Sequence, residues 1–145
     1  MTSLSKPSRG AFARKVGVEL NRAERYRVFV SLTLLDLEPA TAVAGEKASE
    51  ILQDIMSRVK DAVRACDYVE LLNDHCLAVL LPETPRQGAE VAARRLADLV
   101  KVRFSESTGR QIEKVIPVEI ASFPDTAGAR TMAGFLEELA EKSLN

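Results

Sequence analysis

Residues 68–81 read YVELLNDHCLAVLL, which is a pair of short apolar runs on either side of a polar turn. The first run is 68–72, the second is 77–81, and Asn73 and Asp74 lie between them. Because Asn and Asp tolerate the left-handed backbone of a tight turn, this stretch predicts an antiparallel β-hairpin. The segments on both sides must then pack around that hairpin.

Strands and helices are predicted on both sides of the hairpin. Residues 27–37 are rich in branched and aromatic residues and apolar on both alternating faces, which predicts a central strand that ends at Pro39. A second strand is predicted at 112–123, at a sheet edge because Pro117 cannot donate a ladder hydrogen bond. Apolar residues at helical spacing predict helices at 11–25, 46–65, 84–104 and 132–144, the third with Thr84 as N-cap and Pro85 as its first residue.

The predicted elements follow the order α-β-α-β-β-α-β-α. Their βαββαβ centre predicts an α/β (α+β) fold, with a mostly antiparallel central sheet and helices packed on its faces. The 145 residues contain no internal repeat and no low-complexity linker. The sequence therefore predicts a single domain over 1–145.

Composition excludes several classes of protein. Apolar residues make up 46% and charged residues 28%, as in a soluble globular domain, and no apolar run approaches the length of a membrane span. The net charge of −1 gives no basic excess to bind nucleic acid. The N-terminus has no apolar signal core, and two cysteines are too few for a disulfide scaffold. We therefore expect a cytoplasmic protein in which Cys66 and Cys76 are reduced, buried thiols.

Motifs in the order and spacing of a known family span nearly the whole chain. Residues 4–12 are similar to an opening L-T-G-L-P-N-R-x-x-F, and 31–38 to a strand that ends in D-x-D. Residues 64–84 resemble a hairpin and the turn into the next helix, and 118–124 a strand that reads S-I-G-V-A-x-x-P. In these segments the chain resembles a GGDEF domain, the diguanylate cyclase domain of bacterial signal transduction. The resemblance implies the GGDEF, nucleotidyl-cyclase-like fold.

The five signature residues of that family fall on Asn73, Asp74, His75, Cys76 and Leu77. In active members the paired glycines let the backbone approach the nucleotide, the third residue is a metal-binding carboxylate, and the fourth helps to recognise guanine. None of these residue types stands at the aligned positions. The resemblance therefore implies a degenerate member of the family.

The carboxylates of the first strand are incomplete as well, because Asp36 remains but Glu38 replaces the second aspartate. Joining two GTP molecules needs two divalent cations that neutralise charge on phosphate oxygens. Asp36 alone cannot hold that pair, and the imidazole of His75 suits hard Mg²⁺ poorly. We expect no diguanylate cyclase activity, no catalytic residue, no cofactor and no bound metal. Asp36 is then a remnant of the metal site.

A second site of the family, the inhibitory site, binds the product cyclic di-GMP through an R-x-x-D motif before the signature turn. Arg64 and Asp67 match that motif, with 68–72 as the spacer, and Arg95 aligns with a further arginine of the site. The resemblance implies that guanidinium groups hold a guanine edge or a phosphate while the carboxylate accepts hydrogen bonds from guanine. These three residues are the predicted ligand-binding residues.

The same R-x-x-D spacing supports a plainer interpretation. The spacing occurs three times, because Arg58, Arg64 and Arg95 are each followed by an aspartate three positions later in the sequence. On a helix, two residues at this spacing form an ordinary solvated ion pair. Both interpretations stay open at this point.

Three hypotheses for function follow. The first is a catalytically inactive cyclic di-GMP receptor or adaptor, in which ligand drives homodimer formation. The second is a pseudoenzyme that docks on an unidentified signalling protein or dimerises without nucleotide. The third is GTP binding without turnover, through Asp36. Neither nucleic acid nor a membrane is an expected partner.

Overall fold

The computed structural model describes residues 9–124 and 130–143. Its elements, in chain order, are α1 (Arg9–Tyr26), β1 (Val30–Asp36), α2 (Glu38–Ala44), the 3₁₀ helix η2 (Gly45–Lys47), α3 (Ala48–Ala62), β2 (Tyr68–Leu71), β3 (Cys76–Pro82), α4 (Arg86–Thr108), β4 (Val118–Phe123), β5 (Arg130–Thr131) and α5 (Met132–Ser143). The predicted order of strands and helices is confirmed, with α2, η2 and β5 as additions.

Within the described residues the strands form one sheet in the order β2-β3-β1-β4-β5. The neighbours β2–β3, β3–β1 and β1–β4 are antiparallel, and only the two-residue β5 is parallel to its neighbour. Leu71 lies opposite Leu77 at the closed end of the predicted hairpin. The predicted mostly antiparallel sheet, with the first strand at its centre, is confirmed.

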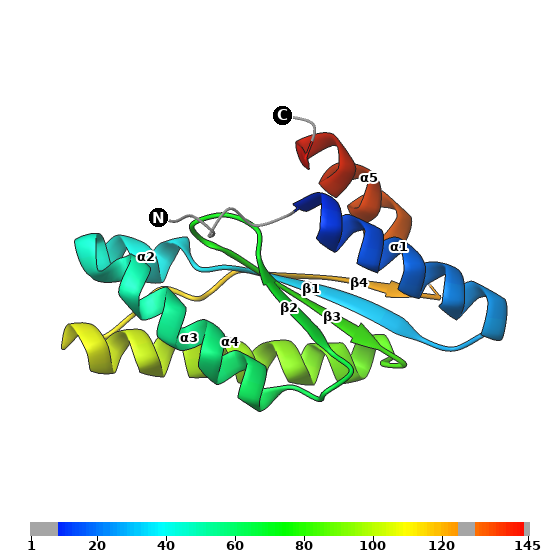
Figure 1. The fold of residues 1–145 in the computed structure, drawn as a ribbon. Helices are drawn as coiled ribbons and strands as arrows, with labels where there is room; N and C mark the ends of the chain where they lie inside the picture. Colours follow the sequence, from blue (N-terminus) through cyan, green and yellow to red (C-terminus); the bar gives the residue numbers. More distant parts are fainter. Residues whose placement is uncertain (1–8, 125–129, 144–145) are drawn as a thin grey trace.

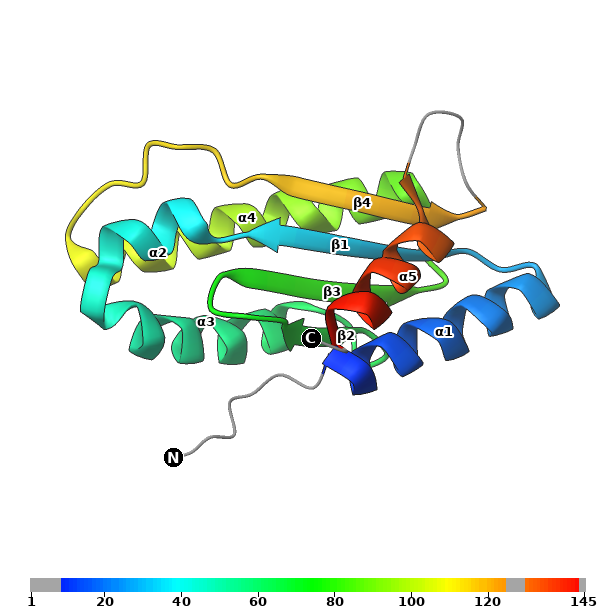
Figure 2. The ribbon, with the colours of Figure 1, turned by 90° about the horizontal axis from the view of Figure 1, so that it is seen from above.

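Helices cover both faces of this sheet (Figures 1 and 2), with α3 and α4 on one face and α1 and α5 on the other. Side chains alternate along each strand, so β1 sends Val30 and Leu32 toward α1 and α5 and Leu35 toward α3 and α4. All three are at most 1% exposed. The sheet is therefore buried on both sides at its centre, as the apolar pattern of β1 predicts.

The region after β1 differs from the prediction. Pro39 does not simply end a strand, because it lies in the first turn of α2, where its missing N–H costs no helical hydrogen bond. Ala40 of α2 is fully buried. The helix predicted at 46–65 is the shorter α3, which begins only after η2 and ends at Ala62.

Two further boundaries differ. Helix α4 begins one residue later than predicted, with Pro85 as its N-cap, so Thr84 is not the cap. Pro117 precedes β4 instead of lying within it, and its carbonyl accepts the Asp36 N–H at 2.9 Å.

The hairpin turn also differs from the prediction, because neither Asn73 nor Asp74 has a positive φ. The side-chain oxygen of Asn73, Oδ1, instead accepts the His75 N–H at 2.8 Å, which closes the turn without a left-handed residue.

Neither cysteine forms a disulfide bond. Cys76 is partly buried, but Cys66 is exposed because it lies in the turn between α3 and β2, so the prediction of a buried thiol there is wrong. Among the described residues, none of the helices has the length and apolar character that crossing a bilayer requires.

Candidate functional site

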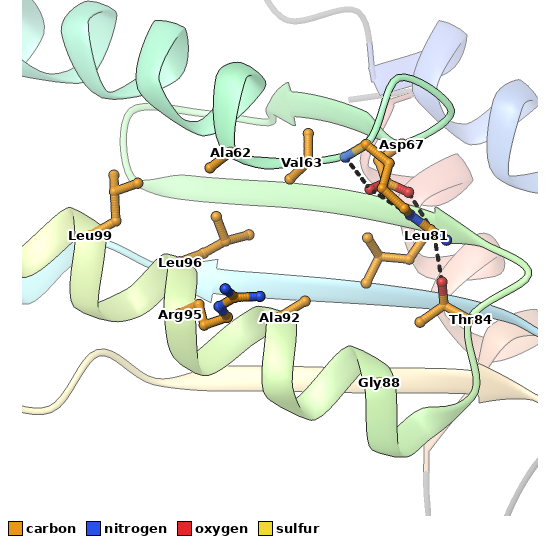
Figure 3. A pocket seen from close by; sticks show the side chains of 11 residues that line it. Ala62, Val63, Asp67, Leu81, Thr84, Gly88, Ala92, Arg95, Leu96 and Leu99 are labelled. Atoms are coloured by element: carbon orange, nitrogen blue, oxygen red, sulfur yellow. Dashed lines mark hydrogen bonds and ion pairs between the residues drawn. The ribbon is translucent and has the colours of Figure 1, made fainter.

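The three predicted ligand-binding residues lie around one cavity of about 570 Å³. The cavity opens between the C-terminal end of α3, the end of β3 and the first half of α4 (Figure 3). Its lining consists of Ala62, Val63, Arg64, Asp67, Leu81, Thr84, Gly88, Ala92, Arg95, Leu96 and Leu99. Residues far apart in the sequence thus meet in one place, as the alignment with the inhibitory site predicts.

Arg64 and Asp67 form a compact turn between α3 and β2. The Asp67 N–H donates to the Arg64 carbonyl at 3.0 Å, and the Arg64 N–H donates to Asp67 Oδ2 at 2.8 Å. The guanidinium donates through Nε to Oδ2 at 3.2 Å and through Nη2 to Oδ1 at 2.8 Å. The Asp67 side chain is only 3% exposed, against 52% for Arg64. The carboxylate is therefore a buried anchor that orients a guanidinium still open to solvent.

Two oxygens of the turn after β3 also contact Arg64. Its Nη2 lies 2.8 Å from the Pro82 carbonyl oxygen and 2.7 Å from Thr84 Oγ1. The hydrogen bond to Asp67 is the main cause that raises the pKa of Arg64 above its ordinary value, so the group is a permanent cation. Among the described residues no partner engages its Nη1, which leaves that nitrogen able to donate to a ligand.

Arg95 lies on the α4 wall of the cavity, across from Asp67 (Figure 3). It is exposed, and in the described part of the chain its guanidinium has neither an ion pair nor a hydrogen bond. Between the two walls lie Leu81 and Leu96, each 3% exposed. The cavity thus combines two cations, one buried carboxylate and an apolar floor, which suits a ligand with anionic groups and a flat apolar ring.

The other two R-x-x-D matches behave differently. Arg58 lies on α3, where its Nε is 3.7 Å from Asp54 Oδ1 rather than near Asp61. Within the described residues Arg95 and Asp98 form no ion pair. Arg64 and Asp67 are not on a helix at all, because α3 ends at Ala62. The ion pair of the plainer interpretation is therefore present, with Arg64 Nη2 2.8 Å from Asp67 Oδ1, but it lies in a turn and not on a helix.

The signature turn is a separate region at the opposite end of β3. There His75 Nδ1 lies 3.2 Å from Asp36 Oδ1, and the same oxygen accepts the Glu38 N–H at 3.0 Å. The side chains of Asp36 and His75 are 48% and 45% exposed. Among the described residues no group of three or more His, Cys, Asp or Glu side chains is placed to hold a metal ion.

The rest of the signature residues divide between core and surface. Leu77 is fully buried, and Cys76 packs against the core under α1 and α5. Asn73 and Asp74 line a different cavity of about 430 Å³ beside α2 and α3, which shares no lining residue with the cavity of Arg64. The two regions are therefore structurally separate.

Thr84 and the Pro82 carbonyl are the parts of the site that the sequence did not predict. The pattern Thr-Pro before an apolar helix indicates an N-cap, so the sequence assigned the Thr84 hydroxyl to the helix and not to Arg64. A backbone carbonyl carries no sequence signal. The available signal is the pair of serines on neighbouring strands, Ser31 and Ser122, because Ser31 donates to the Thr84 carbonyl and contacts Ser122.

Neither a protein-family model nor a curated protein sequence matches the chain. Solved structures do. The GGDEF domain of YfiN (TpbB) from Pseudomonas aeruginosa matches with a TM-score of 0.63 and 22% identity over 97% of this chain and 89% of that one. The GGDEF domain of DgcB from Caulobacter crescentus, solved in complex with c-di-GMP, matches with a TM-score of 0.62 and 12% identity over 94% and 80%.

PelD from Pseudomonas aeruginosa, from residue 158 onward, is also similar, with a TM-score of 0.57 and 23% identity over the whole of this chain and 47% of that one. These identities are low, so the likeness is one of architecture. The chain therefore has the fold of GGDEF domains.

Proposed function

We propose that this chain is a catalytically inactive GGDEF-fold domain that binds cyclic di-GMP through Arg64, Asp67 and Arg95. The observation that carries this proposal is their convergence on a single cavity from the α3–β2 turn and from α4. The solved complex of a GGDEF domain with c-di-GMP is consistent with this class of ligand. Motif matches alone do not require residues 64 and 95 to share a cavity.

The chemistry of the cavity matches that ligand. Cyclic di-GMP carries two phosphates and two guanines, which need cationic donors and flat apolar contact. Arg64 Nη1 and the Arg95 guanidinium supply the donors, and Leu81 and Leu96 supply the apolar floor. The Asp67 carboxylate is already engaged by Arg64, so its role is to hold that guanidinium rather than to receive guanine.

The proposed inactivity rests on the signature turn. A two-cation reaction needs several hard oxygen ligands in one place. Asp36 instead contacts His75 and the Glu38 backbone, and the Glu38 side chain is exposed. Incubation of the pure protein with GTP and Mg²⁺ is expected to give no cyclic di-GMP, and Mg²⁺-dependent product would overturn this part of the proposal.

Calorimetric titration with cyclic di-GMP tests the binding. We expect micromolar affinity, about −8 kcal/mol, and a loss of about a hundredfold or more in Arg64→Ala. Arg58→Ala is the matched control, because Arg58 is an exposed arginine with the same R-x-x-D spacing that lies outside the cavity. Equal losses in both variants, or no heat with the wild-type protein, would refute the receptor.

A second candidate is a nucleotide-independent interaction module. The observation that favours it is that Arg64 already has internal partners in Asp67, Pro82 and Thr84, so the turn is stable without a ligand. Sedimentation separates the two proposals. A receptor whose ligand joins two domains associates only when cyclic di-GMP is added, whereas an interaction module has the same oligomeric state with and without it.

A further inference from the structure

The turn that joins β3 to α4 contacts the same guanidinium nitrogen of Arg64, Nη2, that Asp67 binds. Thr84 Oγ1 accepts from Arg64 Nη2 at 2.7 Å and donates to the Pro82 carbonyl at 3.0 Å. Nη2 carries two protons and has three acceptors, namely Asp67 Oδ1, the Pro82 carbonyl and Thr84 Oγ1, so the acceptors share its protons. Every donor on Nη2 and Nε is thus used, and Nη1 is the part left for a ligand.

The position of the Thr84 hydroxyl is fixed by its own methyl group. A β-branched side chain has few allowed rotamers, so placing the methyl also places the hydroxyl. That methyl lies against Gly88, where an added Cβ would come within 3.1 Å of it. Gly88 therefore leaves the room that lets Thr84 point its hydroxyl at Arg64.

A buried chain of hydroxyl groups supports the turn from inside the sheet. Ser31 on β1 donates to the Thr84 carbonyl at 2.7 Å, and Ser122 on β4 lies 2.7 Å from the Ser31 hydroxyl. Because Ser31 uses its proton on Thr84, Ser122 is the donor between the two. The two serines are 0% and 2% exposed. The backbone carbonyl of Thr84 is therefore hydrogen-bonded to the centre of the sheet, while its side chain lines the cavity.

The backbone of this turn is strained at its middle residue. Glu83 has a φ of 52°, in the left-handed region that side chains other than glycine rarely adopt. Its carboxylate lies 3.3 Å from Arg22 Nη2 on α1. This conformation joins Pro82 and Thr84, both of which contact Arg64, and strained residues of this kind occur preferentially at functional sites.

We propose that Thr84 is a positioning residue of the ligand site, which holds the Arg64 guanidinium so that Nη1 is presented to the ligand. This rests on the proposed binding of cyclic di-GMP at the same cavity. Asp67 binds the guanidinium at Nε and Nη2, and Thr84, whose carbonyl accepts from Ser31, binds it at Nη2 as well. The hydroxyl acts on the ligand through Arg64 and not by direct contact.

Thr84→Val and Thr84→Ser test this proposal as a pair. Valine keeps the shape and removes the hydroxyl, whereas serine keeps the hydroxyl and removes the methyl. In calorimetry with cyclic di-GMP we expect Thr84→Val to bind about tenfold more weakly and Thr84→Ser to stay close to wild type. Thermal unfolding of both variants controls for loss of the fold.

A second readout needs no ligand. Side-chain ¹⁵N NMR of the free protein, with the Arg64 signals assigned through Arg64→Lys, measures rotation about the Nε–Cζ bond. This rotation should be slow in wild type and Thr84→Ser and faster in Thr84→Val. Wild-type rotation and affinity in Thr84→Val, or equal losses in both variants, would overturn the proposal. If the wild-type protein binds no cyclic di-GMP, the proposed receptor function is wrong. The NMR result alone then decides whether Thr84 positions Arg64.

Discussion

The cavity beside Arg64 and the signature turn beside Asp36 lie at opposite ends of β3 and differ in how they use charge. At the cavity, a buried carboxylate holds one guanidinium in place while a second, Arg95, stands opposite without a partner among the described residues. At the turn, Asp36 is half exposed and already contacts His75 and a backbone N–H. In one region the charged side chains surround a cavity, and in the other the polar groups bind each other without lining that cavity.

This difference matters because a ligand binds through groups that the folded protein leaves unsatisfied. Arg64 Nη1 and Arg95 are such groups, and both line the cavity. In the part of the chain that the structure describes, Asp36 belongs to no group of three or more His, Cys, Asp or Glu side chains placed to hold a cation. The comparison therefore predicts that substitutions at the two regions have unequal effects on cyclic di-GMP.

Asp67→Asn should give the largest change. Its loss removes the charge that orients Arg64, so we expect about a hundredfold weaker binding of cyclic di-GMP and a free energy of unfolding lower by about 1–3 kcal/mol. Calorimetry and chemical denaturation measure the two effects. Asp61→Asn, at the exposed aspartate of another R-x-x-D match, is the control and should change neither. Unchanged affinity in Asp67→Asn would remove the carboxylate from the site.

Arg95→Gln should give an intermediate change. Arg95 has no internal hydrogen bond or ion pair among the described residues, so its replacement should leave the unfolding temperature unaltered and weaken cyclic di-GMP binding by about tenfold. Arg94→Gln, one residue away and outside the cavity, should bind as wild type does. A loss of affinity in Arg94→Gln equal to that in Arg95→Gln would mean that general positive charge, and not the cavity, attracts the ligand.

Glu70 lies on β2 between the two regions and allows stability to be changed without altering either. Burial raises its pKa, against an opposing effect of Lys60. A raised pKa in the folded state means that ionised Glu70 destabilises the fold at neutral pH, and that this cost disappears as pH falls below the ordinary value of 4.5. Glu70→Gln should therefore unfold at a higher temperature at pH 7 with no gain at pH 4, and it should bind cyclic di-GMP normally.

The smallest effect is expected at the signature turn. Asp36→Asn keeps an oxygen that can accept the Glu38 N–H and should leave cyclic di-GMP affinity unchanged, because the two regions share no lining residue. Calorimetry under the conditions used for Asp67→Asn gives the comparison. A loss of affinity in Asp36→Asn would show that the regions are coupled or that the ligand binds at the turn.

Most of the fold could be predicted because strand and helix periodicity are properties of the sequence itself. The hairpin at 68–81 and the central strand β1 were both recognisable from apolar patterns. Helix α2 was missed because Pro39 ends a strand and begins a helix with equal ease, and only burial of Ala40 against α4 and its neighbours decides between them.

The site was only partly predictable. Alignment with a known motif brought Arg64, Asp67 and Arg95 together, and the structure places all three around one cavity. The pairing of Asp67 with Arg64 followed from the plainer ion-pair interpretation and not from the alignment, and neither predicted that Thr84 would contact the same guanidinium. Those contacts depend on how the β3–α4 turn approaches the α3–β2 turn, which is a property of the tertiary structure.

Binding of cyclic di-GMP at the cavity of Arg64 can be tested by a backbone ¹⁵N NMR map of the wild-type protein during addition of the ligand. We expect the shifts to concentrate at the residues that line the cavity, which fall within 62–67, 81–84 and 88–99, while 36–38 and 73–77 stay unchanged. Shifts that concentrate on the signature turn, or a spectrum that does not respond at all, would contradict binding at this cavity.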